Sequence, residues 1–223
     1  MFDLAEWSYF WVGVERAELA RGTVVNGTQM YVEYWMPREV LHPFPVVMVH
    51  GGGGQGLDWM GTGDGRPGWA FNLLSAGYKV YVVDRPGHGR SPSHPEFHGP
   101  FGRATTFEQA ARQFTAPEKA PNPYGDQAKL HTQWPGAGTL GDPTVDQIVA
   151  GQGGAFLADL EATHDIWRAR LIQLFEKIGP AFIMCHSMGG PAGWIIGDAR
   201  PNGTEIVQRL SCCAGRCRQG PRD

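Results

Sequence analysis

Apolar runs and helical spacing alternate along the chain in a regular order. Residues 45–50 and 78–84 are short, mostly apolar runs, as expected of strands buried on both faces. Between them, residues 69–76 place apolar side chains at helical spacing, and Gly77 ends that pattern. Because a strand, a helix and a second strand in this order form the unit of a parallel sheet, we expect an α/β fold.

Further elements are predicted on both sides of this unit. Strands are expected over residues 7–15, 30–36 and 181–185, and residues 205–210 are expected to begin one more. Helices are expected over residues 106–114, 156–178 and 190–199. Asn26-Gly27 indicates a hairpin turn, and Glu108, three residues after Thr105, indicates a capping box. Gly179-Pro180 is expected to end the longest helix.

The same pattern divides the chain into four stretches. Residues 1–91 and 156–210 carry the periodic elements of one core. Residues 92–155 are rich in Pro, Gly, Gln and His and lack strong periodicity, which is typical of a lid or a disordered insertion. Residues 211–223 are basic and cysteine-rich without apolar periodicity, so we predict an unstructured tail.

Composition narrows the function classes. The formal net charge is −3 and no basic stripe dominates, which argues against a nucleic-acid-binding protein. No apolar stretch approaches the length of a membrane span, and no secretory leader is visible, so we expect a cytoplasmic protein with reduced thiols. Cysteine and histidine spacing fits no zinc site, and we expect neither a metal nor a cofactor. The oligomeric state is not indicated.

Two loops that follow strands could carry chemistry. In residues 50–56, His-Gly-Gly-Gly-Gly-Gln-Gly, the glycines let backbone N–H groups turn toward a small anion. A phosphate-binding loop is excluded because no Gly-Lys-Ser or Gly-Lys-Thr follows, and the fingerprint of a dinucleotide site is also missing. Residues 84–91, which include His88, are interpreted mainly as a turn that shapes the rim of the sheet.

The third loop carries a candidate nucleophile. Ser187 stands between an apolar run and a helical pattern, where a sharp strand-to-helix turn would hold its hydroxyl away from the backbone. Such a turn needs small residues two positions before and two after the serine. Gly189 meets this need, and Cys185 is small enough to replace the more usual glycine.

In this order the three loops resemble the α/β-hydrolase superfamily, over about residues 8–207. Trp59 and residues 64–69 are similar to a narrower, esterase-like group. The resemblance implies a mostly parallel sheet with helices on both faces and a cap over residues 92–155. It also implies Ser187 as the nucleophile and a small apolar, ester-like substrate. The backbone N–H groups of Gly52 and Met188 would form the oxyanion hole, supported by His50, Gly51, Gly53, His186 and Gly189.

One feature departs from the family pattern. The family order is serine, then acid, then histidine, yet no histidine follows Ser187, and the only later carboxylates are Asp198, Glu205 and Asp223. Neither His50 nor His186 is favoured as a substitute base. We therefore expect a C-terminally incomplete hydrolase with impaired activity. A non-catalytic pseudoenzyme or ligand-binding remnant of the same fold is the alternative, and a lyase or peroxidase on this fold also stays open.

Overall fold

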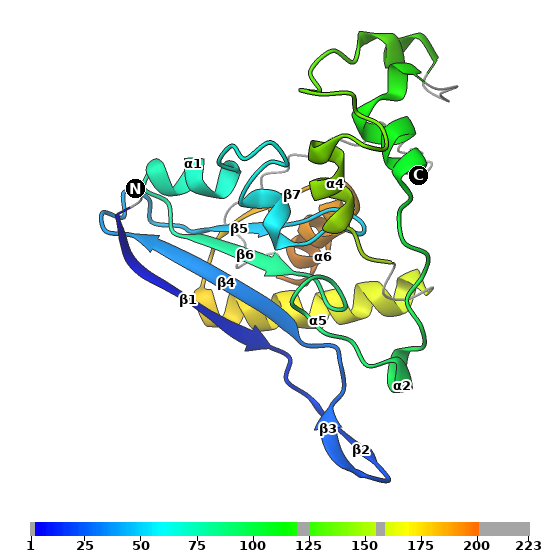
Figure 1. Ribbon diagram of the computed structural model, residues 1–223. Coiled ribbons are helices and arrows are strands. Elements are labelled where there is room, and N and C mark those ends of the chain that lie inside the picture. The colour runs from blue at the N-terminus through cyan, green and yellow to red at the C-terminus, as the bar shows by residue number, and fades with distance from the viewer. Residues whose placement is uncertain (1–2, 120–124, 155–158, 201–223) are drawn as a thin grey trace, which may run out of the picture.

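A five-stranded mixed sheet forms the centre of the computed structural model, which describes residues 3–119, 125–154 and 159–200 (Figure 1). The strand order is β1 (Leu4–Val12), β4 (Met30–Pro37), β6 (Val80–Asp84), β5 (Val46–Val49) and β7 (Phe182–Cys185). β5 runs parallel to both β6 and β7, whereas β4 runs antiparallel to β1 and β6. The α/β fold class is confirmed, with antiparallel pairing at the β1 side of the sheet.

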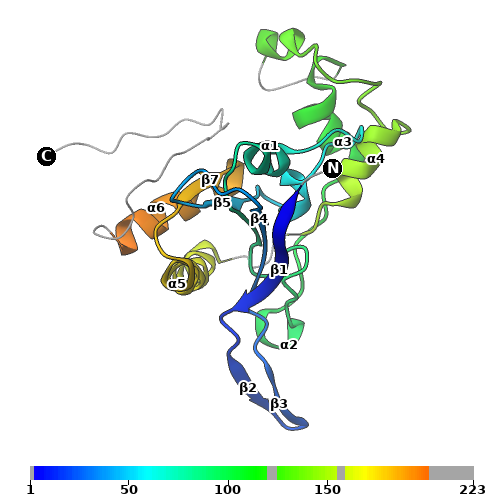
Figure 2. The same ribbon diagram turned by 90° about the vertical axis from the view of Figure 1, so that its left-hand side faces the viewer.

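Helices cover both faces of the sheet (Figures 1 and 2). α1 (Trp69–Ser75) lies on one face, and α5 (Leu160–Ile178) and α6 (Gly190–Ala199) lie on the other. The buried strands supply side chains to both layers. Val47 and Val49 pack with α5 and α6, while Val46 and Met48 pack with α1. This two-sided burial explains why the β5 run is continuously apolar.

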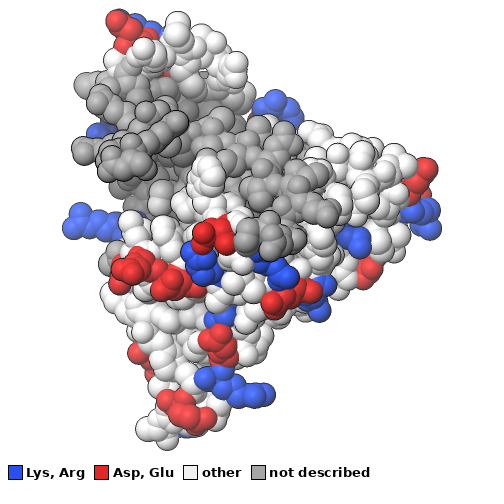
Figure 3. All heavy atoms as spheres, turned by 180° about the vertical axis from the view of Figure 1, so that it is seen from behind, with Lys and Arg blue, Asp and Glu red and all other residues white. Residues whose placement is uncertain are grey.

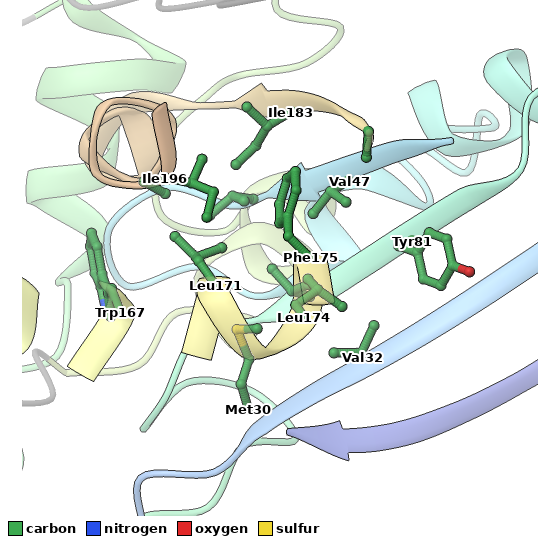
Figure 4. Packing of buried hydrophobic residues seen from close by; sticks show 14 of the residues in the cluster. Met30, Val32, Val47, Tyr81, Trp167, Leu171, Leu174, Phe175, Ile183 and Ile196 are labelled. Carbon is green, nitrogen blue, oxygen red and sulfur yellow. The ribbon is translucent and has the colours of Figure 1, made fainter. Parts of the chain in front are cut away.

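The larger core lies between the sheet and the α5–α6 layer. In Figure 4 the side chains of Leu171 and Phe175 from α5 lie close to Val47 and Ile183 of the sheet. The predicted helical spacing over α5 therefore corresponds to one buried face. Asp159 caps the helix by accepting from the N–H groups of residues 161 and 162, so α5 begins at Leu160. Residues 156–158 of the predicted helix lie outside the described part of the chain. Gly179, at φ +80°, ends it as expected.

A small hairpin was missed by the sequence analysis. β2 (Arg16–Leu19) and β3 (Gly22–Val25) form a separate two-stranded sheet that projects from the body (Figure 1). Its turn lies between Leu19 and Gly22, so the prediction that Asn26-Gly27 forms the hairpin turn is wrong. The short strands have no buried face, which explains why they carry no apolar pattern.

The described part of residues 92–155 is built of short helices. These are α2 (Pro95–His98), α3 (Phe107–Ala110), one wider turn over Ala111–Thr115, two 3-10 turns over Pro117–Lys119 and Gly125–Leu130, and α4 (Pro143–Ala150). Thr106, rather than Thr105, caps α3 by accepting from the N–H of Gln109. The part from α3 onward stands beyond the carboxyl ends of β5 and β6 (Figure 1). We continue to interpret the whole stretch as a cap.

Two expectations fall outside the described residues: the strand beginning at 205–210 and the tail at 211–223. Among the residues that are described, no helix is long and apolar enough to cross a bilayer. The same part of the chain shows no grouping of three or more potential metal ligands. On the face drawn in Figure 3, acidic and basic side chains are intermixed.

Candidate active site

The candidate nucleophile and the glycine loop meet at the same edge of the sheet. β5 and β7 are parallel neighbours, and their register pairs Val49 with Cys185. The chain therefore leaves both strands at the same level. The N–H of His186 donates to the carbonyl oxygen of Val49 at 3.1 Å, which continues the ladder by one residue into the turn. The sequence separates the two loops by more than a hundred residues, and strand pairing brings them together.

Ser187 has a strained backbone. Its φ is +49°, and it is the one residue other than glycine with a positive φ in the described part of the chain. Such a conformation costs about 1–3 kcal/mol and persists only where the surroundings enforce it. The turn is closed by the N–H of Gly189, which donates to the carbonyl oxygen of His186 at 2.8 Å, and α6 begins at the next residue. Ser187 thus occupies the sharp strand-to-helix turn that its sequence predicted.

Gly189 permits the turn to sit directly on β5. A Cβ atom at this position would overlap the carbonyl oxygen of His50 and lie 2.9 Å from the carbonyl oxygen of Val49. Both obstacles are backbone atoms that cannot rotate away. The need for a residue without a side chain two positions after the serine therefore has a visible steric cause.

The glycine loop packs against the serine turn. A Cβ on Gly51 would lie 2.8 Å from Nδ1 of His186 and 3.3 Å from Cβ of Ser187, and a Cβ on Gly52 would lie 2.8 Å from Cγ of Met188. Side chains on the loop would therefore separate it from the serine. Without them the Met188 side chain lies directly against Gly52, so the loop contacts the residue that follows Ser187. The role of the Gly52 and Met188 N–H groups as an oxyanion hole stays a prediction. Gly51 is buried, and Gly52 is exposed.

His50 is fully buried and both of its ring nitrogens are engaged. Nδ1 lies 2.8 Å from the carbonyl oxygen of Gly51, and Nε2 accepts from the backbone N–H of Arg85 at 3.0 Å. Burial, helped by the charge of Arg85, holds the pKa of His50 well below 6.5, so the ring is neutral. A ring tied on both sides supports the loop and is not arranged to act as a base for Ser187.

The other two histidines near the site are not arranged as bases either. Nδ1 of His88 lies 3.0 Å from the carbonyl oxygen of Pro86, and burial together with Arg85 lowers the pKa of His88 to about 4. His186 stands edge-on to the Trp59 ring, with centroids 6.4 Å apart. No hydrogen bond between Ser187 and a histidine is present within the described ranges. Of the three carboxylates that follow Ser187 in the sequence, Asp198 lies on α6 and pairs with Arg168 at 2.9 Å. Glu205 and Asp223 lie outside the described residues.

Two residues of the 84–91 turn contact the glycine loop, and sequence reasoning missed both. Asp84 accepts from the N–H of Gly56 and from Arg90, so it ties the far end of the loop to the rim of the sheet. Arg85 is buried, and its Nη2 donates to the carbonyl oxygen of Gly51. The sequence signal that could have indicated these contacts is the strand-helix-strand pattern, which predicts that β5 and β6 are parallel neighbours. Parallel pairing places residues 50 and 84 together at the carboxyl edge of the sheet.

Two hydrogen bonds join the stretch that we interpret as a cap to the glycine loop. The N–H of Gly153 donates to the carbonyl oxygen of Gly53 at 2.6 Å, and Nε2 of Gln55 donates to the carbonyl oxygen of Gly151 at 3.1 Å. Residues 151–153 follow α4, so the position of that helix is linked to the shape of the loop. This link was not predicted from the sequence.

Comparisons with known proteins identify the family. The chain is 38% identical over 195 residues to a protein described as a probable secreted lipase, phiG, from Fungal sp. (strain ATCC 74256), a match that covers 87% of this chain. The chain spans about half (50%) of the length of that relative. A solved structure described as a novel bacterial esterase superposes with a TM-score of 0.69 at 22% identity, covering 92% of this chain and 67% of that one. Since the model of the alpha/beta hydrolase family also matches residues 46–221, the chain belongs to that family.

Proposed function

We propose that this chain supplies the nucleophile and the oxyanion hole for hydrolysis of carboxylic esters. The observation that carries the proposal is the forced positive φ of Ser187 directly beside the Gly51–Gly52 backbone. The Ser187 oxygen would attack the ester carbonyl, the N–H groups of Gly52 and Met188 would bind the resulting oxyanion, and loss of the alcohol would leave an acyl-enzyme. Water would then release the acid and free the serine.

The surroundings of Ser187 favour an apolar ester. Met188 is 50% exposed and Trp69 is 54% exposed beside the buried Trp59, whose ring reaches His186. Exposed apolar side chains next to a polar anion site match a substrate with an apolar acyl or alcohol group. The lipase and esterase descriptions of the two similar proteins support the same substrate class.

The activity of this chain by itself is proposed to be weak. Attack by serine requires a base to take the hydroxyl proton, and the sequence has no histidine after Ser187. In a well-studied serine protease, loss of one member of the catalytic set lowers kcat by roughly 10⁴–10⁶-fold. The remaining oxyanion hole would still accelerate acylation above the reaction of an ordinary serine.

A fluorophosphonate probe tests the proposal. In the labelling step a bond forms between the Ser187 oxygen and phosphorus, fluoride leaves, and the hydroxyl proton passes to solvent. We expect mass spectrometry to find the label on Ser187 and not on Ser75 of α1, with no label in the Ser187→Ala variant. If the folded protein is unlabelled while a ligand-binding screen finds apolar ligands, the non-catalytic alternative is correct. The observation that supports this alternative is the lack of a hydrogen bond between Ser187 and a histidine in the described residues.

A further inference from the structure

The carbonyl oxygen of Gly51 accepts from two buried donors. One is Nη2 of Arg85, which comes from the turn after β6. The other is Nδ1 of His50, 2.8 Å away. Both side chains lie inside the protein, at 4% and 0% exposure, so neither bond competes with water. A backbone carbonyl bound by a guanidinium is held more tightly than one bound by neutral groups alone.

The backbone of Arg85 fixes which nitrogen of His50 carries the proton. Its N–H donates to Nε2 of His50 at 3.0 Å, so Nε2 must be the unprotonated, accepting nitrogen. The single proton of the neutral ring is therefore on Nδ1, where it can be donated to Gly51. Arg85 thus acts on the Gly51 carbonyl directly through its side chain and indirectly through His50.

The bound carbonyl belongs to the peptide unit of one proposed oxyanion donor. The Gly51 carbonyl and the Gly52 N–H are joined in the same planar peptide, and the described chain has no cis peptide bond. In a trans peptide the two groups point in opposite directions. Because the carbonyl points inward to Arg85 and His50, the Gly52 N–H points away from them, on the side where Gly52 is exposed and approaches Met188.

We propose that Arg85 and His50 are positioning residues for the oxyanion hole, which orient the Gly51–Gly52 peptide and polarise it so that the Gly52 N–H becomes a stronger donor. The inference rests on the proposed function, since it concerns the same anion site. Hydrogen bonding at the carbonyl end of an amide strengthens donation at its N–H end. Preorganised donors of this kind lose no energy to reorientation during the reaction.

The environment of Arg85 supports a role beyond stability. No ion pair joins Arg85 to a carboxylate in the described part of the chain, and its Nε is buried without a hydrogen-bond partner. The guanidinium instead stacks over the Trp167 ring, 4.7 Å from its centroid. Burying a cation without a paired carboxylate costs folding free energy. Burial lowers the pKa of Arg85 to about 10, so the group stays charged at neutral pH and its field acts on the peptide.

A trifluoromethyl ketone provides a direct measure of the oxyanion hole. The Ser187 oxygen adds to the ketone carbon, and the serine proton moves to the former carbonyl oxygen to give a hemiketal. Ionisation of that hydroxyl creates the oxyanion that Gly52 would bind, and ¹⁹F NMR follows it as the pH changes. We expect Arg85→Met to weaken oxyanion binding about tenfold, which raises the midpoint of this ionisation by about one pH unit. In Arg85→Lys, which keeps a cation at this position, the ionisation midpoint should lie between those of Arg85→Met and the natural chain.

Arg170→Lys serves as the matched control. Arg170 is also a buried arginine, but it bonds the carbonyl oxygen of Thr28 and the carboxylate of Glu15, away from the glycine loop. We expect this variant to lose stability and to leave the ionisation midpoint unchanged. If Arg85→Met forms the adduct with an unchanged midpoint, the inference is overturned while the proposed function stands. If the natural chain forms no adduct at Ser187, both fail.

A measurement on the unaltered protein covers the case in which the Arg85 variants do not fold. Hydrogen bonds to a carbonyl oxygen move the ¹³C resonance of that carbonyl downfield. We expect the Gly51 carbonyl carbon to be shifted downfield relative to the carbonyl carbons of Gly65 and Gly99. These two glycines serve as the reference because they lie in open surroundings, with nothing within 4 Å of a Cβ built at either position. A Gly51 resonance at the position of these open glycines would overturn the inference without any substitution.

Discussion

The carbonyl oxygen of His50 occupies the space that a side chain on Gly189 would need. We predict that Gly189→Ala lowers the free energy of unfolding by about 2–3 kcal/mol, because the backbone of β5 must move to admit the methyl group. Gly190→Ala is the matched control. Gly190 has nothing within 4 Å of a Cβ and a helical φ of −52°, so this change should be neutral or stabilise by up to about 1 kcal/mol. Urea denaturation of both variants checks the pair, and equal losses would contradict the close approach.

The positive φ of Ser187 predicts that glycine at this position is more stable than alanine. Glycine accepts this conformation without a steric penalty, whereas alanine keeps the strain. We expect Ser187→Gly to be more stable than Ser187→Ala by about 1 kcal/mol, after allowance for the greater freedom of glycine in the unfolded chain. Thermal melting of the two variants measures the difference. An alanine variant that is the more stable of the two would show that the turn is relaxed.

The serine turn and its surroundings show which parts of the fold and the site could be predicted from the sequence. The serine turn and the strands β4, β5, β6 and β7 were predictable because each is a local pattern: an apolar run, a glycine and a helical period. The contacts of Arg85 were not, since a charged residue in a Pro-Gly turn is normally exposed. Its burial follows from the parallel pairing of β5 and β6, which no local pattern reports. The β2–β3 hairpin was missed because neither of its strands has a buried face.

The buried histidine of the 84–91 turn predicts a loss of stability in mild acid. The pKa of His88 is lowered to about 4 in the folded state by burial and by Arg85, against 6.5 for the ordinary group. Below pH 6.5 the unfolded chain binds a proton that the folded chain does not, so the free energy of unfolding falls as the pH drops toward 4. His88 alone should account for about 2 kcal/mol between pH 7.5 and pH 5.

Comparison with His88→Gln isolates this effect from those of other groups. Urea denaturation at several pH values should show a smaller decline for the variant than for the natural chain. Both proteins share all other titrating residues, including the buried His50. Parallel pH curves would mean that His88 titrates normally in the folded protein.

Asp142 predicts that the cap residues loosen in strong acid. Its carboxylate accepts from Nε1 of Trp134 at 2.8 Å and from the backbone N–H groups of Gly138 and Thr144, and these bonds lower its pKa to about 2. The stabilisation is therefore complete above pH 4 and is lost as the pH falls toward 2. A change in Trp fluorescence should appear over this range and, in Asp142→Asn, already at neutral pH. Asp146→Asn, on the helix that Asp142 caps, is the control and should behave like the natural chain.

The bond from Gln55 to Gly151 predicts that a single substitution weakens the attachment of residues 144–154 to the glycine loop. In Gln55→Ala the backbone bond between Gly153 and Gly53 remains, but the second attachment is lost. One partly buried hydrogen bond contributes about 1 kcal/mol, so local opening of residues 144–154 should become roughly fivefold more frequent. Hydrogen exchange measured by mass spectrometry checks this. Gln29→Ala removes a comparable bond to the carbonyl oxygen of Pro92, which involves neither the glycine loop nor residues 144–154, and it should leave exchange in 144–154 unchanged. If both variants exchange alike there, the Gln55 side chain does not hold residues 144–154 against the glycine loop.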